Sequence, residues 1–128
     1  MTRRERGAVS VEIALGLPML LTLVLGGVHL GRVLMARHEL ADAASYATRA
    51  AAIAGGAPEA QIRAVIRGRL GPASACGNVA VQSRTVADDI GVTRLEVTAR
   101  CAVATGIGGA LLGALGPGEL TVHVAQPM

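Results

Sequence analysis

The fold is decided by residues 13–31, which read IALGLPMLLTLVLGGVHLG. These 19 residues carry no formally charged side chain and lie between Glu12 and Arg32. The core of a bilayer, about 30 Å thick, needs about 20 apolar residues in helical form, so this stretch is long enough to span a membrane. The short flank before it, MTRRERG, is basic, and the positive-inside rule predicts that it stays in the cytoplasm while the rest of the chain is exported.

The composition of the 128 residues points away from a free-standing enzyme. Hydrophobic residues make up 52% and charged residues only 16%, while Tyr46 is the single aromatic residue. Small apolar side chains suit helices that pack in a membrane or an assembly. No nucleophile elbow, phosphate loop or dinucleotide fingerprint occurs, so we expect no catalytic residues, no cofactor and no metal site. Three of the twelve arginines lie in the first seven residues and no basic stripe follows, so we expect no nucleic-acid partner.

The informative motif lies before the apolar stretch. The basic leader ends in Gly7, and Glu12 follows after the four small or apolar residues 8–11. This pattern resembles the class III signal of type IV pilin-like proteins, and its continuation to residue 54 resembles the TadE-like family. Those proteins are pseudopilins or minor pilins of the tight-adherence (Tad/Flp) pilus system. The resemblance implies that a prepilin peptidase cuts between Gly7 and Ala8. Many pilins carry an aromatic residue where this chain has Ile13, which weakens the resemblance to a major subunit.

A lone carboxylate beside an apolar stretch needs a physical explanation, because an unpaired charge in the membrane costs a few kcal/mol or more. Cleavage after Gly7 frees the amine of Ala8, which carries a positive charge near neutral pH and can pair with Glu12 of its own or a neighbouring chain. The family resemblance implies that this pair sets the register of subunits during assembly. The alternative is a solvated Glu12 that the dipole of the helix N-terminus favours by about 0.3–1 kcal/mol.

Four residues inside the stretch bear on helix packing. Pro18 lacks a backbone donor and can kink the helix, which membranes tolerate where neighbours satisfy the freed groups. Glycines let another helix approach closely, and three of them form a predicted packing notch: Gly26, Gly27 and Gly31. Alternatively, these are glycines of the kind common in membrane helices, with no partner helix.

The helical pattern continues beyond the apolar stretch and predicts one helix over residues 8–54, with its membrane-spanning part at about 13–31. Its second half places seven residues on one face: Val33, Leu34, Leu40, Ala44, Ala47, Ala51 and Ala54. Gly55 and Gly56 end this helix. Pro58 suits the first position of a second helix over residues 58–70, which turns Ile62, Val65, Ile66 and Leu70 to one side. We expect Arg63, Arg67 and Arg69 on its exposed side, solvated or in contact with lipid head groups.

From residue 77 onward the period changes to two. Three alternating segments predict strands at residues 78–86, 92–101 and 120–124, with a turn at residues 88–91. The sequence thus predicts an α+β, pilin-like fold, in which a long membrane-spanning N-terminal helix continues into a small head, residues 55–128, with a second helix and a three-stranded antiparallel sheet.

The segment 102–118 is apolar, rich in glycine and uncharged over about 17 residues. We expect an exposed insert that contacts another subunit or the membrane surface, and TadE-like proteins often carry a comparable insert before the last strand. A second membrane span and collapse onto the head are the alternatives.

The two cysteines, Cys76 and Cys101, both fall in the part predicted to be exported. In an oxidising compartment such a pair predicts one disulfide, here between the start of the first strand and the end of the second. Two reduced, buried thiols would be expected instead if the head were cytoplasmic.

Together these features predict a pseudopilin or minor pilin subunit of a Tad/Flp-type pilus or a related secretion filament. We expect a single-pass protein of the bacterial inner membrane, cytoplasmic at residues 1–7 before cleavage and with an exported head that can enter an extracellular pilus. The expected partners are other pilin or pseudopilin subunits, the prepilin peptidase, inner-membrane lipids and the Tad assembly machinery. Two alternatives stay open: a permanent bitopic membrane protein with a disulfide-stapled interaction head, and a secreted domain released by ordinary signal peptidase.

Overall fold

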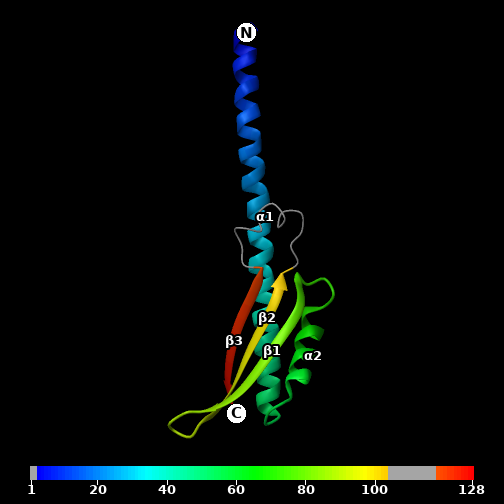
Figure 1. The fold of residues 1–128 in the computed structure, drawn as a ribbon, viewed down its shortest axis with the longest axis vertical. Coiled ribbons are helices and arrows are strands. Elements are labelled where there is room, and N and C mark those ends of the chain that lie inside the picture. Colours follow the sequence, from blue (N-terminus) through cyan, green and yellow to red (C-terminus); the bar gives the residue numbers. More distant parts are fainter. Residues whose placement is uncertain (1–2, 104–117) are drawn as a thin grey trace.

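The fold contains two helices and a three-stranded sheet. The computed structural model describes residues 3–103 and 118–128, and the surroundings of side chains from Ser10 onward. The elements follow one another as α1 (Arg3–Ile53), α2 (Glu59–Leu70), β1 (Cys76–Ala87), β2 (Thr93–Val103) and β3 (Glu119–Pro127). Both helices lie beside the sheet, and α1 continues far beyond it (Figure 1). The predicted α+β, pilin-like arrangement is confirmed.

The first helix is a single rod of 51 residues, about 75 Å long. It begins at Arg3 rather than at the predicted residue 8, because arginine and glutamate are good helix formers and Gly7 costs only about 1 kcal/mol. It continues through Pro18 without a break. It ends where Gly55 and Gly56 take positive φ angles of 76° and 115°, and the amide of Gly56 donates to the carbonyl of Ala51 at 2.8 Å.

The second half of α1 packs against the sheet and α2 through small side chains. The buried face follows helical spacing and comprises Ala36, Leu40, Ala43, Ala44, Ala47, Thr48 and Ala51. The predicted face was wrong at two positions: Leu34 is 48% exposed, and Ala54 lies beyond the helix end and is exposed. Leu34 lies six residues before Leu40, which turns it about 120° around the helix axis, away from the buried face. The hydroxyl of buried Thr48 donates to the carbonyl of Ala44 at 2.7 Å, so no donor is left unpaired there.

The second helix covers one side of the core. Pro58 was predicted to be the first helical residue. It is instead the N-cap that precedes the helix, because its ψ of 147° is extended rather than helical. Ile62 and Ile66 are buried, and Val65 and Leu70 pack partly against the core as expected.

The sheet is an antiparallel meander in the order β1–β2–β3. Its inner face is formed by alternate residues: Val79, Val81, Leu95, Val97, Ala99, Cys101 and Leu120. All three strands are longer than predicted, because hydrogen-bond pairing continues past the clearest alternation. The β1–β2 turn closes at Gly91, whose φ of 79° places it in the left-handed region and whose amide donates to the carbonyl of Asp88 at 2.8 Å.

The structure describes only the two ends of the predicted apolar insert, residues 102–118. Ala102 and Val103 belong to β2 rather than to the insert, and Glu119 begins β3. The remaining residues, 104–117, lie outside the described residues, and so do the three interpretations of the insert.

The rotation of α1 predicts that two leucines six residues apart differ strongly in their contribution to stability. Leu40→Ala should lower the free energy of unfolding of the head by about 2–5 kcal/mol, because it leaves a cavity in a fully buried position. Leu34→Ala, the same truncation on the exposed side, should change it by less than about 0.5 kcal/mol. Urea unfolding of the detergent-solubilised chain, followed through the fluorescence of its single aromatic residue, Tyr46, measures both; equal losses would contradict the assigned face.

Candidate functional site

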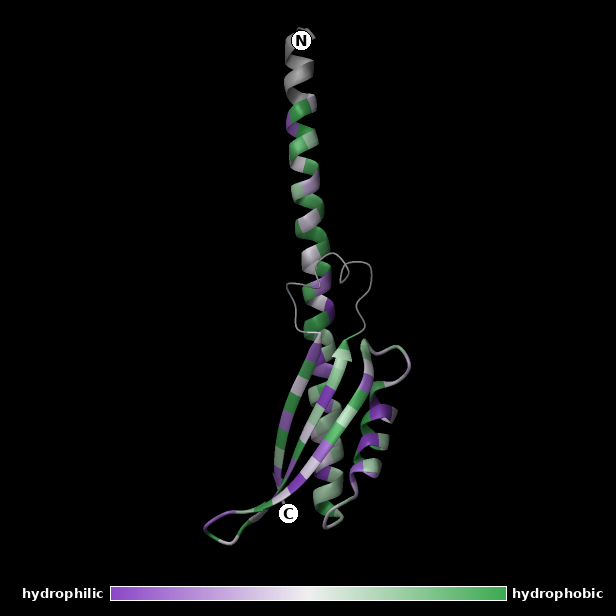
Figure 2. Ribbon diagram, viewed as in Figure 1, coloured by the Kyte–Doolittle hydropathy of each residue, from purple (hydrophilic) through white to green (hydrophobic). Residues whose placement is uncertain are grey.

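The exposed half of α1, which we call the stem (residues 10–35), is the main candidate site. None of its residues is buried within the described chain. Fourteen large apolar side chains between Val11 and Met35 are 44–75% exposed. Figure 2 shows this run of hydrophobic residues extending beyond the sheet. Within the described residues, α1 is the one helix long and apolar enough to cross a membrane, by length and composition.

The predicted cleavage site and the acidic residue lie on this same helix. The bond between Gly7 and Ala8 falls inside α1, and Glu12 follows Ala8 by four residues, which is one helical turn. Positions four apart on a helix lie on the same face, so an amine at Ala8 and the carboxylate of Glu12 would be neighbours. Glu12 is exposed and forms no ion pair with any described residue.

The predicted packing residues are only partly brought together. Gly26 and Gly27 line one shallow apolar groove on the stem, together with Met19, Thr22, Leu23 and Leu30. No atom lies within 4 Å of a Cβ built on either glycine, so this groove is open. Gly31 lies outside the groove. Pro18 is linked to it because Thr22 Oγ1 donates to the Pro18 carbonyl at 2.8 Å, which keeps the hydroxyl satisfied inside an apolar helix.

The disulfide forms a second candidate site, at the end of the sheet nearest the stem. Cys76 and Cys101 are bonded, with 5.5 Å between their Cα atoms and 25 residues between them in the sequence. Cys101 is 1% exposed, whereas Cys76 is half-buried. The predicted bridge between the start of β1 and the end of β2 is therefore confirmed.

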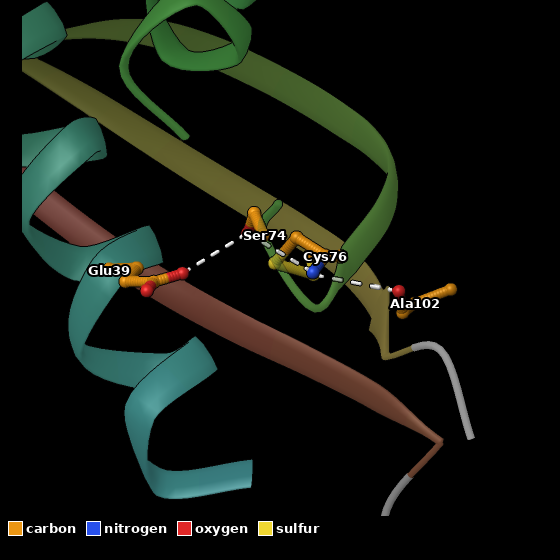
Figure 3. Close-up of a disulfide and its surroundings, with 5 residues drawn as sticks. Glu39, Ser74, Cys76 and Ala102 are labelled. Carbon is orange, nitrogen blue, oxygen red and sulfur yellow. Dashed lines mark hydrogen bonds between the residues drawn. A yellow bond between two sulfur atoms is a disulfide. The ribbon is translucent and has the colours of Figure 1, made fainter. Parts of the chain in front are cut away.

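A short polar chain joins this disulfide to α1 (Figure 3). The amide of Cys76 donates to Ser74 Oγ, and Ser74 Oγ in turn donates to Glu39 Oε2, each at 3.2 Å. The disulfide thus joins the first residue of β1 to β2, and Ser74 joins the preceding α2–β1 loop to α1. No sequence pattern pointed to Glu39, since its partner is 35 residues away.

Two of the three arginines of α2, Arg67 and Arg69, are exposed as expected, whereas the expectation was wrong for Arg63. Arg69 stacks on the ring of Tyr46 in α1, with 4.1 Å from its guanidinium carbon to the ring centroid. Arg67 donates to Asn78 Oδ1 in β1 at 2.8 Å. Arg63 is half-buried, and its Nε has no partner among the described residues. Arg63 and Arg67 are four residues apart and lie on the same face of α2, whereas Arg69, two residues after Arg67, lies on another side.

Comparison with known proteins finds a family match over the part of the chain that includes the stem. Residues 7–49 match the family described as TadE-like protein. No curated protein and no solved structure matches the chain. The chain thus carries a TadE-like domain, and TadE-like proteins are components associated with the Tad pilus rather than known enzymes.

The disulfide should be a major source of stability for a head with so few large side chains. Replacing both cysteines (Cys76→Ala with Cys101→Ala) should lower the free energy of unfolding by about 3.5 kcal/mol, from the entropy of closing a 25-residue loop. Urea unfolding under oxidising conditions measures this loss, and reducing the native chain with dithiothreitol should reproduce it. A loss below about 1 kcal/mol would show that the loop is held by other contacts.

Proposed function

We propose that this chain, which carries a TadE-like domain at residues 7–49, is a pseudopilin or minor pilin subunit of a Tad/Flp-type pilus or a related secretion filament. The single observation that carries the proposal is the coincidence of that domain with the stem and with the motif from Gly7 to Glu12. In this proposal a prepilin peptidase removes residues 1–7 and the stem anchors the subunit in the bacterial inner membrane. The exported head then contacts other subunits and the Tad machinery.

The exposure of the stem supports a membrane or helix-packed environment. A large apolar side chain left in water costs about 1.5–3 kcal/mol relative to burial, and the stem exposes fourteen of them. Lipid tails and the stems of neighbouring subunits both remove this cost. When a subunit passes from the membrane into a filament, its stem would leave lipid tails and contact the stems of other subunits. The apolar surface of the stem therefore suits both the membrane-bound and the assembled subunit.

The motif around the cleavage site supports a specific role for Glu12 in that passage. Before cleavage, Gly7 and Ala8 are joined by a neutral peptide bond, and Glu12 has no positive partner one turn before it on α1. Cleavage replaces this peptide bond with the charged amine of Ala8. Pairing of the two charges, within one subunit or between neighbours, lowers the cost of placing the carboxylate among apolar stems.

One observation favours a second candidate, a permanent bitopic membrane protein that keeps its leader. The α1 helix continues from Arg3 through the bond between Gly7 and Ala8, and a peptidase needs that segment to unwind locally. Glycine at position 7 eases unwinding, since it destabilises a helix by about 1 kcal/mol relative to alanine. The fate of the leader therefore separates the two candidates.

Leader removal is tested by the intact mass of the chain extracted from membranes of cells that contain a prepilin peptidase. The native chain should lack the mass of residues 1–7, and Gly7→Ala should retain it. Gly16→Ala makes the same change at an open position of the same helix and should be processed normally. A native chain that retains Met1, or that begins beyond the apolar stretch, would refute the proposal.

The role of Glu12 is tested by a change that removes only its charge. Glu12→Gln should still be processed and held in the membrane, but its recovery in sheared filaments should fall about tenfold or more, because each 1.4 kcal/mol lost from the charge pair is a factor of ten. Glu12→Asp keeps the charge and should assemble better than Glu12→Gln. Equal assembly of Glu12→Gln and the native chain would rule out charge pairing.

A further inference from the structure

The two edges of the sheet differ in how they are covered. At the β1 edge, α2 packs alongside the strand, and Glu59 Oε1 accepts a hydrogen bond from the Ser83 amide at 2.9 Å. A helix and a carboxylate therefore occupy the middle of this edge. At the β3 edge no described residue forms a hydrogen bond with an outward-facing backbone group.

The register identifies which groups of β3 face outward. In an antiparallel pair, hydrogen-bonded and non-bonded positions alternate. The amide of Met128 donates to the carbonyl of Thr93 at 2.9 Å, and the amide of Val103 donates to the carbonyl of Gly118 at 3.2 Å. These two bonds lie at the two ends of β3, so by the alternation the even-numbered residues between them also bond to β2. The backbone groups that point away from the sheet thus belong to Glu119, Thr121, His123 and Ala125.

Between Thr121 and Ala125 this edge lacks the features by which proteins usually block strand addition. Its pairing with β2 is uninterrupted from Glu119 to Pro127, without a bulge. It carries no lysine or arginine, its one acidic residue, Glu119, is the first residue of the strand, and its only proline is the last. Native edges are commonly protected by charges, bulges, prolines or a covering element. A long, regular and open edge indicates a surface that pairs with another strand.

We propose that the β3 edge pairs with the β3 edge of a second copy of this chain, in parallel orientation. This inference rests on the proposed function in one respect, which is that both copies are anchored in one membrane by α1. Figure 1 shows that β3 runs in the same direction as α1, so two copies with parallel stems present parallel β3 strands. Antiparallel pairing would point the two stems in opposite directions, and pairing with the β1 edge meets α2 and Glu59.

The pairing also fixes how the two copies are displaced. In parallel strands, a residue that bonds to its neighbour lies opposite a residue whose own groups point away. Both copies offer odd-numbered residues, so one copy is displaced along the strand by an odd number of residues, at about 3.3 Å per residue. The rotation that brings the two edges together exchanges the faces of the sheet, so the helices of the two copies lie on opposite faces of a continuous sheet.

The proposal is tested in membranes that contain the full chain with two different epitope tags. A photoreactive amino acid, p-benzoylphenylalanine, replaces exposed His123, and cross-linking should join the two tagged copies. With the probe at Ala125 instead, fragmentation of the product should place the attachment in the C-terminal half of the second copy's strand. Attachment near Glu119 would indicate antiparallel strands and overturn the proposal.

A matched pair of prolines separates edge pairing from folding. Thr121→Pro removes an outward amide of β3 and should abolish the cross-link, while leaving the bonds to β2 intact. Thr85→Pro removes the equivalent outward amide of β1 and should leave the cross-link unchanged. Formation of the disulfide between Cys76 and Cys101 confirms that each variant folds.

Leader removal and retention in the membrane are measured in the same samples. A processed, membrane-held chain that gives no product between copies, or that cross-links only to another protein, overturns the edge pairing and leaves the proposed function standing. An unprocessed chain that still cross-links between copies overturns the subunit function alone. A cross-link that survives Thr121→Pro also overturns the pairing.

Discussion

The contact on which the rest of the structure depends is the small-residue face of α1 against the sheet. Alanines at this face let the helix approach the strands closely, and Leu40, with no exposed surface, supplies the largest side chain that α1 contributes to the core. From Ser10 to Met35 the same helix has no buried residue, and it exposes fourteen large apolar side chains there. A single rod is therefore held by the protein at one end and requires lipid or other helices at the other.

The head compensates for its lack of aromatic residues by cross-links at the end nearest the stem. The disulfide joins the start of β1 to β2, and Ser74 in the α2–β1 loop donates a hydrogen bond to Glu39 of α1. Arg69 and Tyr46 join the two helices farther along. Two of these contacts, through Glu39 and Tyr46, join α1 to the α2–β1 loop and to α2.

Local patterns predicted most of the elements, since period, glycine and proline act over a few residues. The long helix, the amphipathic second helix and the alternation of Leu95, Val97 and Ala99 follow from spacing alone, and so did the disulfide once an exported head was expected. The predictions of side-chain burial were wrong where packing against a distant segment of the chain decides which face of a helix is buried. Leu34 is apolar enough for a core, but the rotation of α1 on the sheet turns it away. In α2, Arg63 is half-buried rather than exposed because of the way the helix packs on the head.

The sequence by itself determined the apolar stretch, the position of Gly7 and Glu12 before it, and the order of helices and strands, because these depend on composition and short-range periodicity. Only the tertiary structure decided which face of α1 is buried, how Ser74 reaches Glu39, and that α2 covers the β1 edge of the sheet while no described residue bonds to the β3 edge. These features depend on the relative placement of segments far apart in the chain, which no local pattern encodes.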